Sequence, residues 1–343
     1  MVIHKVRDSH GNSMDAWDRD LEAFAAANPH VHVVDSPAAI RRLSSRASML
    51  QVLPCCLQLP QGIACIPRQL IVHADDALDA TMEALVARAG LSLPLVAKPM
   101  LVDGSLSSHR LALVTEEQGL GALQAPLVLQ EFYNHGGVLF KVNVVGQSVT
   151  VVERNSLPDL DGGDAERSWD SDEEAEGRSG SGGEDVVGED AAVWEGGVTS
   201  VISPDERERR GVRLFERISS AYASEGKRRS GALAAVCAPP EDLVRKLAAE
   251  LRERLGLQLF NFDLIRARQS PDRYYVIDIN YFPGFSKLPD YHTIFTQFLL
   301  GLCAGERPPK CSDREQAIKR NECARRAAAA AVQTSRGLPV ESQ

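Results

Sequence analysis

Hydrophobic residues recur along the chain in two patterns, one with the spacing of helices and one with the apolar or alternating runs of strands. Helical spacing with capping residues predicts a helix that starts after Ser13 and another that runs from Pro37 to Leu50. Later helices are predicted at residues 75–89, 241–255 and 294–302. Strand-like runs occupy residues 1–5, 30–35, 62–66, 69–73, 93–99, 110–114 and 125–132.

Two further pairs of strand-like runs are separated by turn-forming residues and predict β-hairpins. The first pair, residues 139–145 and 148–154, is joined at Gly146 and Gln147. The second pair, residues 257–265 and 274–279, is joined by the Gln-Ser-Pro-Asp segment at residues 269–272. Because hairpins pair their strands antiparallel, the predicted class is α+β or mixed α/β rather than a doubly wound parallel sheet.

The second hairpin carries acidic residues at corresponding positions. If Ser270 and Pro271 form its tip, regular pairing places Asp263 directly opposite Asp278, with Asn280 on the same face. Two carboxylates held face to face repel unless a cation lies between them or one of them keeps its proton. Two carboxylates and an amide oxygen suit Mg²⁺ in phosphoryl-transfer sites. The spacing alone is equally compatible with an exposed hairpin whose acids bind nothing.

The negative charge of the chain is concentrated in one segment. The formal net charge is −9, but residues 159–190 hold 13 acidic and 2 basic residues, so the remainder carries +2. This segment has few apolar residues, which predicts a disordered insertion at residues 159–195, either a plain surface loop or a regulatory or partner-binding segment. The mildly basic remainder suits an anionic ligand but lacks the strongly basic balance of a nucleic-acid-binding protein.

No apolar run reaches the length that spans a membrane, and the first residues lack the apolar region of a secretory signal. We therefore expect a cytoplasmic protein, with the nucleus as a further compartment. Seven scattered cysteines without a C-x-x-C motif predict reduced thiols rather than a disulfide framework or a zinc site.

Two segments offer groups that bind phosphate. Lys98 ends the apolar strand LVAK, where its ammonium group would lie at the rim of a sheet and could contact a nucleotide phosphate. The Gly- and Ser-rich loop at residues 103–109 follows it and ends at His109, and its backbone N–H groups could cradle phosphate. Each feature alone is more typical of an ordinary solvated strand end or loop.

The segment QEFYNHGGVLFK, residues 130–141, combines an interrupted strand with aromatic and basic residues. Its break at residues 134–137 leaves backbone donors and acceptors free beside Phe132, which is a plausible edge for adenine. The first hairpin then places Lys141 opposite Val152 and diagonal to Arg154, forming a basic patch. A solvated sheet face remains the alternative interpretation of this patch.

Taken together, these segments resemble the inositol 1,3,4-trisphosphate 5/6-kinase (inositol-tetrakisphosphate 1-kinase) family, which has the ATP-grasp fold. The likeness runs from residue 1 to about residue 302, apart from the acidic insertion. It is carried by VIHK, SRASMLQ, LVAKP, GSLSSH, QEFYNHGGVLFKVNVVG, ERNSLP, LFNFDLIR and YYVIDINYFPGFSKLPDY.

The resemblance implies an ATP- and Mg²⁺-dependent kinase, a monomer, that phosphorylates a hydroxyl of soluble inositol polyphosphates. It implies that Mg²⁺ is held by Asp263, Asp278 and Asn280. It assigns ATP binding to Arg46, Lys98, Gln130, Glu131, Phe132, Lys141 and Ser156. It assigns the inositol phosphate to Lys5, His109, Lys141, Arg154, Asn280 and Gly284, and catalysis to Lys98, His109 and Lys141.

The same resemblance implies a division of the chain. Residues 1–45 would be the remnant of an inositol-phosphate-binding subdomain, residues 46–128 and 129–303 two ATP-grasp lobes, and residues 304–343 a disordered tail. Family members carry a further N-terminal α/β unit that supplies another substrate lysine, so the sequence is either truncated or lacks part of the inositol site. A catalytically weak nucleotide- or inositol-phosphate-binding protein and an ATP-grasp carboxylate–amine ligase are the two alternative functions.

Overall fold

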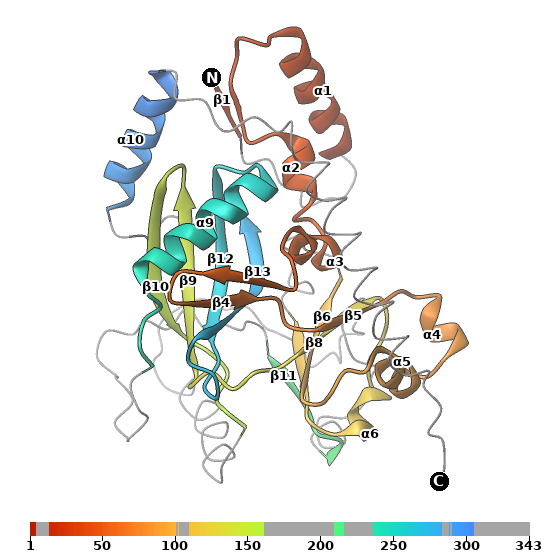
Figure 1. Ribbon diagram of the computed structural model, residues 1–343. Coiled ribbons are helices and arrows are strands. Elements are labelled where there is room, and N and C mark those ends of the chain that lie inside the picture. The colour runs from red at the N-terminus through yellow and green to blue at the C-terminus, as the bar shows by residue number, and fades with distance from the viewer. Residues whose placement is uncertain are drawn as a thin grey trace, which may run out of the picture.

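The computed structural model describes residues 1–4, 14–100, 102, 110–160, 209–215, 236–282, 288 and 290–304, and these residues form three sheets with surrounding helices (Figure 1). One sheet has six strands, one has five and one has two. No helix in the described part of the chain is long and apolar enough to cross a membrane. The mixture of helices with largely antiparallel sheets confirms the predicted fold class.

The six-stranded sheet has the strand order β10-β9-β12-β13-β4-β3. Its strands are β3 (Cys56–Leu59), β4 (Gly62–Cys65), β9 (Val138–Val145), β10 (Ser148–Asn155), β12 (Leu259–Arg266) and β13 (Arg273–Tyr281). All neighbours pair antiparallel except β13 and β4. Both predicted hairpins are present and become neighbours, because β12 pairs with β9 as well as with β13.

Helix α9 (Glu241–Leu255) packs its apolar stripe against the core of this sheet. The leucines that repeat every fourth residue, Leu243, Leu247, Leu251 and Leu255, are all buried. The helix ends at Gly256, whose left-handed conformation favours glycine. The predicted helix at residues 241–255 is thereby confirmed.

The five-stranded sheet is antiparallel and has the order β11-β7-β6-β8-β5. Its strands are β5 (Gln69–Val72), β6 (Leu95–Pro99), β7 (Leu111–Val114), β8 (Leu127–Glu131) and β11 (Val212–Phe215). Helices α4 (Asp76–Asp79), α5 (Met82–Ala89) and α6 (Glu117–Leu120) lie beside it in Figure 1. Residues of α5, α6 and these strands share one hydrophobic cluster, a core separate from that of the six-stranded sheet.

The N-terminal elements are α1 (Met14–Ala27), the two-stranded parallel sheet of β1 (Val2–Ile3) and β2 (Val33–Val34), α2 (Pro37–Arg41), α3 (Arg46–Met49) and the 3₁₀ turn η1 (Leu50–Val52). The prediction of one helix from Pro37 to Leu50 was wrong, because the chain breaks at Ser44 and Ser45. The Ser44 carbonyl accepts a hydrogen bond from the Val102 N–H, and Ser45 adopts an extended conformation and caps α3 through its side chain. The hydrogen bond to Val102 and the cap at Ser45 thus divide the predicted helix into α2 and α3, although its apolar residues repeat with helical spacing throughout.

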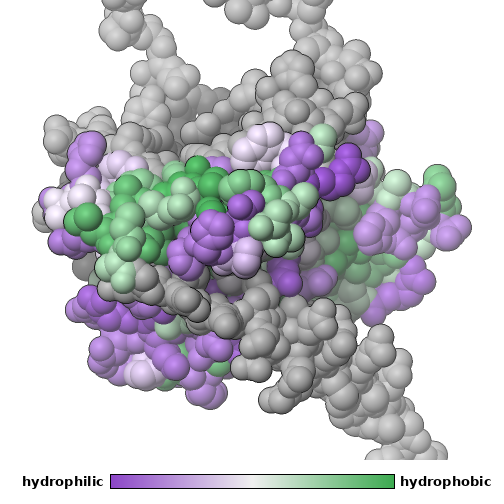
Figure 2. All heavy atoms as spheres, turned by 90° about the horizontal axis from the view of Figure 1, so that it is seen from above, coloured by the Kyte–Doolittle hydropathy of each residue, from purple (hydrophilic) through white to green (hydrophobic). Residues whose placement is uncertain are grey.

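The helix predicted at residues 75–89 is divided in the same way, since Ala80 is extended and Thr81 caps α5. Helix α10 (Tyr291–Cys303) confirms the last predicted helix and packs Phe298 against the β9–β10 turn. Leu300 of this helix is 63% exposed, and the view from above shows a band of hydrophobic residues on this face of the molecule (Figure 2).

The cysteine prediction was wrong for one pair. Cys56 and Cys65 are directly opposed in the β3–β4 hairpin and form a disulfide. Strand β3 was not predicted, and neither was this pairing, because the two cysteines are brought into register only by the turn at Pro60 and Gln61. Gln61 takes a positive φ there, which allows the two-residue connection.

Candidate active site

The two acids of the second hairpin lie where the sequence predicted. Asp263 pairs directly with Asp278, and Asn261 pairs with Asn280, so the acids and the amides occupy one face of the sheet. On its other side Asp263 pairs with Lys141 of β9. The predicted ladder was nevertheless wrong near the turn, where the register is shifted by one residue and is restored by a bulge.

The bulge has a consequence for the site. Ile277 is the one residue of this part of β13 without a register partner in β12. Its carbonyl oxygen accepts a hydrogen bond from Lys98 Nζ at 2.9 Å, and Gln130 Oε1 accepts another from the same ammonium group at 2.7 Å. Lys98 is thereby held between the five-stranded sheet, from which it projects, and the acidic strand of the six-stranded sheet.

Three cationic side chains, Lys98, Lys141 and Arg46, lie beside the acids or next to one another. Lys141 Nζ lies 2.9 Å from Asp263 Oδ1 and 3.3 Å from the side-chain oxygen of Asn261. Arg46 is buried, and its guanidinium donates to the carbonyl of Pro99, next to Lys98. The site therefore combines two carboxylates with three cations in a largely desolvated position, which matches the charge pattern of a site for a metal–phosphate complex.

Burial dominates the ionisation of these groups. Burial raises the pKa of the Asp263 carboxyl, and the Asp278 charge adds to this effect, whereas Lys141 opposes it. Burial lowers the pKa of Lys98 to about 8, although the two aspartates act in the opposite direction. For Lys141 burial alone would lower the pKa, but the charges of Asp263 and Asp278 raise it above the usual value. The acids thus hold Lys141 in its charged form.

The oxygen donors fit a divalent cation. Asp263 is 6% exposed, and its Oδ1 accepts no hydrogen bond of ordinary geometry although Lys141 lies nearby. Asn280 now donates its amide N–H to Asp278 Oδ2 at 2.9 Å, so ligation would require its amide to turn its oxygen inward. No cluster of three or more His, Cys, Asp or Glu exists among the described residues, so the donor set would be two carboxylates, an amide and non-protein oxygens.

The predicted adenine edge follows β8 and forms a connected set. His135 bridges this segment to Ser156, because its Nδ1 contacts the Tyr133 carbonyl at 2.7 Å and its Nε2 contacts Ser156 Oγ at 2.7 Å. A carbonyl only accepts, so Nδ1 carries the proton and Nε2 accepts from the serine. Burial lowers the pKa of His135, which keeps the ring neutral and suits this arrangement.

An apolar patch adjoins the acids on the same face of the six-stranded sheet. Tyr275 stacks on Tyr133 with a ring separation of 3.9 Å, and both contact the cluster that contains Leu139, Ile265 and Ile277. Tyr133 also donates to Glu131 Oε2 at 2.9 Å. One end of this face is thus charged and the other aromatic and aliphatic, which matches a ligand with a polyanionic end and a flat apolar end.

The described residues bring most of the expected site together. Lys98, Gln130, Lys141, Asp263, Asp278 and Asn280 converge through the contacts above, and the charge of Arg154 lies close enough to lower the pKa of Lys141. Arg46 donates to the Pro99 carbonyl, Glu131 ends β8, and Phe132 and Ser156 both contact His135. Lys5, His109 and Gly284 lie outside the described residues, as do most of the acidic insertion and the tail.

Sequence reasoning missed several contributors. Asn261 could have been found, because it shares the alternating face of Asp263 in LFNFD. Tyr133 and Tyr275 lie in segments that carry the family resemblance, but their stacking could not be predicted, because it joins two sheets. The Ile277 carbonyl had no signal at all, because a backbone group becomes available there only through the bulge.

Comparison with known proteins identifies the family of the chain. A model of the inositol 1,3,4-trisphosphate 5/6-kinase ATP-grasp domain matches residues 60–173 and 186–301. The chain is 41% identical to inositol-tetrakisphosphate 1-kinase 1 of Oryza sativa subsp. indica over 304 residues, covering 88% of this chain and 71% of the relative. It is 42% identical to inositol-tetrakisphosphate 1-kinase 3 of Glycine max over 311 residues, covering 90% and 73%.

A solved RiPP-associated ATP-grasp ligase from Chryseobacterium gregarium is similar with a TM-score of 0.43 and 16% identity, over 88% of this chain and 72% of that one. The family model covers well over half of the chain, and the named relatives extend the match across most of it. The chain therefore belongs to the inositol 1,3,4-trisphosphate 5/6-kinase family and contains its ATP-grasp domain.

Proposed function

We propose that this protein is an ATP- and Mg²⁺-dependent kinase that transfers the terminal phosphoryl group of ATP to a hydroxyl of a soluble inositol polyphosphate. The observation that carries the proposal is the Asp263–Asp278 pair, which faces Lys141 on one side and lies close to Lys98 on the other. Phosphoryl transfer depends mainly on alignment and charge neutralisation, and this arrangement supplies both.

The two ends of the ligand-facing surface set the orientation of ATP. The aromatic and aliphatic end, with Tyr133 and Tyr275, would take the adenine beside the backbone of Glu131 and Phe132. The triphosphate would then extend toward Lys98 and Lys141 at the charged end. The hydrogen bond between His135 and Ser156 ties the segment after β8 to the residue that follows β10.

Each polar residue then has a defined task. Lys98 and Lys141 contact phosphate oxygens, and Arg46 adds positive charge behind Lys98. Asp263, Asp278 and Asn280 would hold Mg²⁺, which when bound neutralises charge on the phosphates. Asp263 must then exchange its contact with Lys141 for the metal, which frees the lysine ammonium for phosphate.

The acceptor side rests on the likeness to the family and on the names of the relatives. Lys5, His109, Arg154, Asn280 and Gly284, together with Lys141, would bind the inositol phosphate, with His109 next to the transferring group. The matched relatives are named inositol-tetrakisphosphate 1-kinases, which supports an inositol tetrakisphosphate as acceptor at the 1 position. Inositol 1,3,4-trisphosphate, phosphorylated at position 5 or 6, is the other acceptor that the family model supports.

The organisation of the molecule is also part of the proposal. We infer a cytoplasmic monomer with the division at residues 45, 128 and 303 described above. The two separate hydrophobic clusters support two lobes, although Leu50 and Ala64 pack in the cluster of the six-stranded sheet and Val212 in that of the five-stranded sheet.

The test is phosphoryl transfer with labelled ATP and a panel of inositol tris- and tetrakisphosphates, with and without Mg²⁺. We expect label in an inositol phosphate that carries one more phosphate group than the acceptor, and only with Mg²⁺. ATP binding without any labelled inositol product, or phosphate release that depends on an added carboxylate and amine, would contradict the proposal. Separation of the products by anion exchange identifies the acceptor and the ring position.

A further inference from the structure

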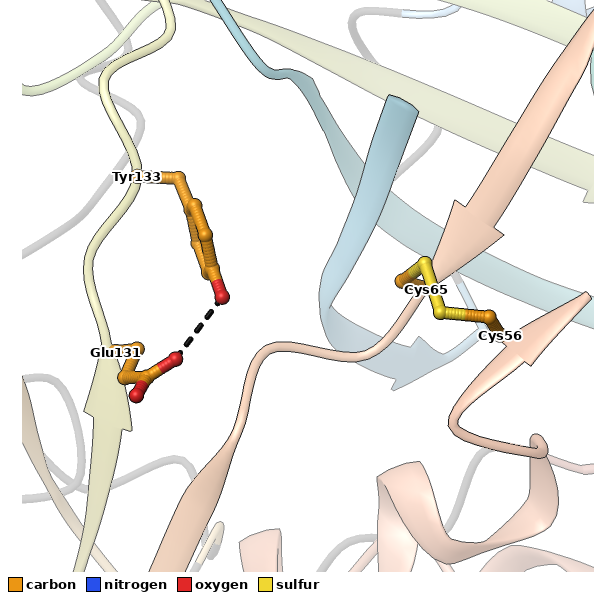
Figure 3. The surroundings of a disulfide bond; sticks show 4 residues. All are labelled: Cys56, Cys65, Glu131 and Tyr133. Atoms are coloured by element: carbon orange, nitrogen blue, oxygen red, sulfur yellow. Dashed lines mark hydrogen bonds between the residues drawn. A yellow bond between two sulfur atoms is a disulfide. The ribbon is translucent and has the colours of Figure 1, made fainter. Parts of the chain in front are cut away.

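The Cys56–Cys65 disulfide lies beside the apolar end of the proposed ATP site. Cys65 pairs with Tyr275 in the parallel β4–β13 ladder and is 1% exposed within the cluster that contains Tyr275 and Ile277. Tyr275 stacks on Tyr133, whose hydroxyl donates to Glu131. Figure 3 shows Glu131 and Tyr133 on the β8 side and the disulfide on the β3–β4 hairpin.

The two sulfurs of this disulfide differ in access. Cys56 belongs to an exposed position of β3, the edge strand of the six-stranded sheet, whereas Cys65 is buried. Nothing in the phosphoryl transfer proposed above uses either sulfur atom. Exposed disulfides are more easily reduced than buried ones and are commonly the labile or regulatory ones.

We propose that Cys56–Cys65 is a thiol–disulfide modification site, that its reactant is a dithiol, and that its closed form holds the adenine end of the ATP site in its binding-competent shape. The effect on ATP rests on the proposed function, whereas the modification site itself does not.

The reaction is balanced as ordinary thiol–disulfide exchange. A thiolate of the dithiol attacks the exposed Cys56 sulfur, the Cys56–Cys65 bond breaks, and Cys65 leaves as a thiolate that takes a proton. The second thiol of the reagent then attacks the mixed disulfide and releases Cys56 as a thiol. The protein gains two electrons and two protons, and the dithiol becomes a cyclic disulfide.

The expected direction follows from the position of the hairpin. In the described part of the chain β3 pairs only with β4, so besides the two-residue turn at its end the disulfide is its covalent link to the sheet. Opening it allows β3 to fray and relaxes β4, which supports Tyr275 and through it Tyr133. ATP then has to order Tyr133 and Tyr275 when it binds. This ordering costs free energy, so the reduced protein binds ATP more weakly.

The experiment compares the full chain oxidised by the cyclic disulfide of dithiothreitol with the chain reduced by dithiothreitol. Alkylation in denaturant, followed by peptide mapping, should show Cys56 and Cys65 blocked in the oxidised sample and alkylated after reduction. Calorimetry with ATP and Mg²⁺ should show affinity that is lower by roughly fivefold or more in the reduced sample.

Two matched variants locate the effect. Cys56→Ser removes the disulfide and should give one affinity, that of the reduced wild type, under both conditions. Cys55→Ser changes the neighbouring exposed free cysteine and should keep the wild-type difference.

Three outcomes overturn parts of this inference in distinguishable ways. Alkylation of both cysteines in the oxidised sample overturns the modification site. Equal affinity in the two redox states, including no binding in either, overturns the coupling to ATP, as does a difference that persists in Cys56→Ser. ATP binding that follows the redox state without any inositol phosphate product counts against the proposed kinase function and leaves the redox inference standing.

Discussion

At the scale of single residues, Asp278 is the most direct test of the site. Asp278→Ala removes one of the opposed carboxylates and with it the proposed metal position. Because a bound metal supplies several kcal/mol of charge stabilisation in such reactions, turnover should fall by more than about 100-fold. The circular dichroism spectrum should not change.

The control for this change is Asp272→Ala, an acid at the exposed tip of the same hairpin. Its turnover should match the wild type. Normal turnover of Asp278→Ala in the inositol phosphate assay would remove the metal assignment, and with it the main support for the kinase.

Lys98 gives a prediction about pH. Its pKa, lowered by burial to about 8, means that above pH 8 the metal-free protein holds neutral lysine while the unfolded chain still holds the proton. The unfolded state then binds more protons, so this residue makes stability rise with pH between about 8 and 10.5. Binding of a polyanion favours the ammonium form, so nucleotide affinity should instead fall as the pH rises through about 8.

The measurement is proton uptake on binding. At pH 8.5, titration of the metal-free protein with ATP in two buffers of different ionisation enthalpy should show uptake of a fraction of a proton. Lys98→Arg keeps its charge and should lose this uptake. The same uptake in the arginine variant would assign the proton to another group.

The residue scale also shows where sequence reasoning works. The opposition of Asp263 and Asp278 could be predicted because both lie in one short hairpin with a clear turn signal. The bulge at Ile277 could not, because it depends on packing against β4 and on Lys98, which is 179 residues away in the chain. The predicted Asp263–Asp278 pair was therefore correct, although the residues nearer the turn pair one position away from the predicted register.

At the scale of elements, the sequence predicts a helix or strand correctly where its own residues carry both the hydrophobic pattern and the terminating residue. Helix α9 shows this with its leucine stripe and Gly256. The helix from Pro37 to Leu50 failed because Ser44 and Ser45 bind the chain near Val102 instead of continuing the helix. Strand β11 and the Cys56–Cys65 disulfide were not predicted for a related reason. Each is defined by a partner strand rather than by its own sequence.

Gly146 allows an element-scale test of how α10 is attached. A Cβ added there would lie 2.6 Å from the Phe298 ring, and the residue has a φ of +58°. Gly146→Ala therefore combines backbone strain with a clash, and we expect a loss of about 2–4 kcal/mol in the free energy of unfolding, measured by urea denaturation.

Gly90→Ala is the matched control, because Gly90 has a φ of +63° but meets only a flexible arginine terminus at 3.3 Å. It should cost about 1 kcal/mol, the backbone part alone. Combining Gly146→Ala with Phe298→Leu should cost less than the sum of the two single changes. Additive losses would show that Phe298 does not hold α10 at this turn.

At the scale of the whole molecule, the N-terminal sheet is tied to the far end of the six-stranded sheet through buried polar groups. The Asp35 carboxylate accepts from the backbone N–H groups of Gln258 at 2.8 and 2.9 Å and Leu259 at 3.0 Å. His4 Nε2 donates to the Asp35 carbonyl at 2.6 Å, and the Tyr281 hydroxyl donates to the His4 carbonyl at 3.0 Å. Apart from the His4–Asp35 bond, these contacts join residues more than 200 positions apart, so the sequence alone could not indicate them.

Asp35→Asn tests this connection with almost no change in shape. Asp35 is 3% exposed, so an amide that turns one N–H toward the donors of Gln258 and Leu259 loses charge-assisted bonds and leaves donors unsatisfied. The expected loss is about 1.5–3 kcal/mol of unfolding free energy. Glu22→Gln makes the same chemical change in an exposed ion pair with Arg41 and should cost under about 1 kcal/mol.

Because β1 precedes the proposed inositol-phosphate residue Lys5 and β13 carries Asp278, the Asp35 variant should also raise the KM for inositol phosphate more than the KM for ATP. Equal stability of the two variants would mean that the N-terminal sheet is held by its apolar contacts alone, and the substrate end of the site would then depend on packing rather than on this buried carboxylate.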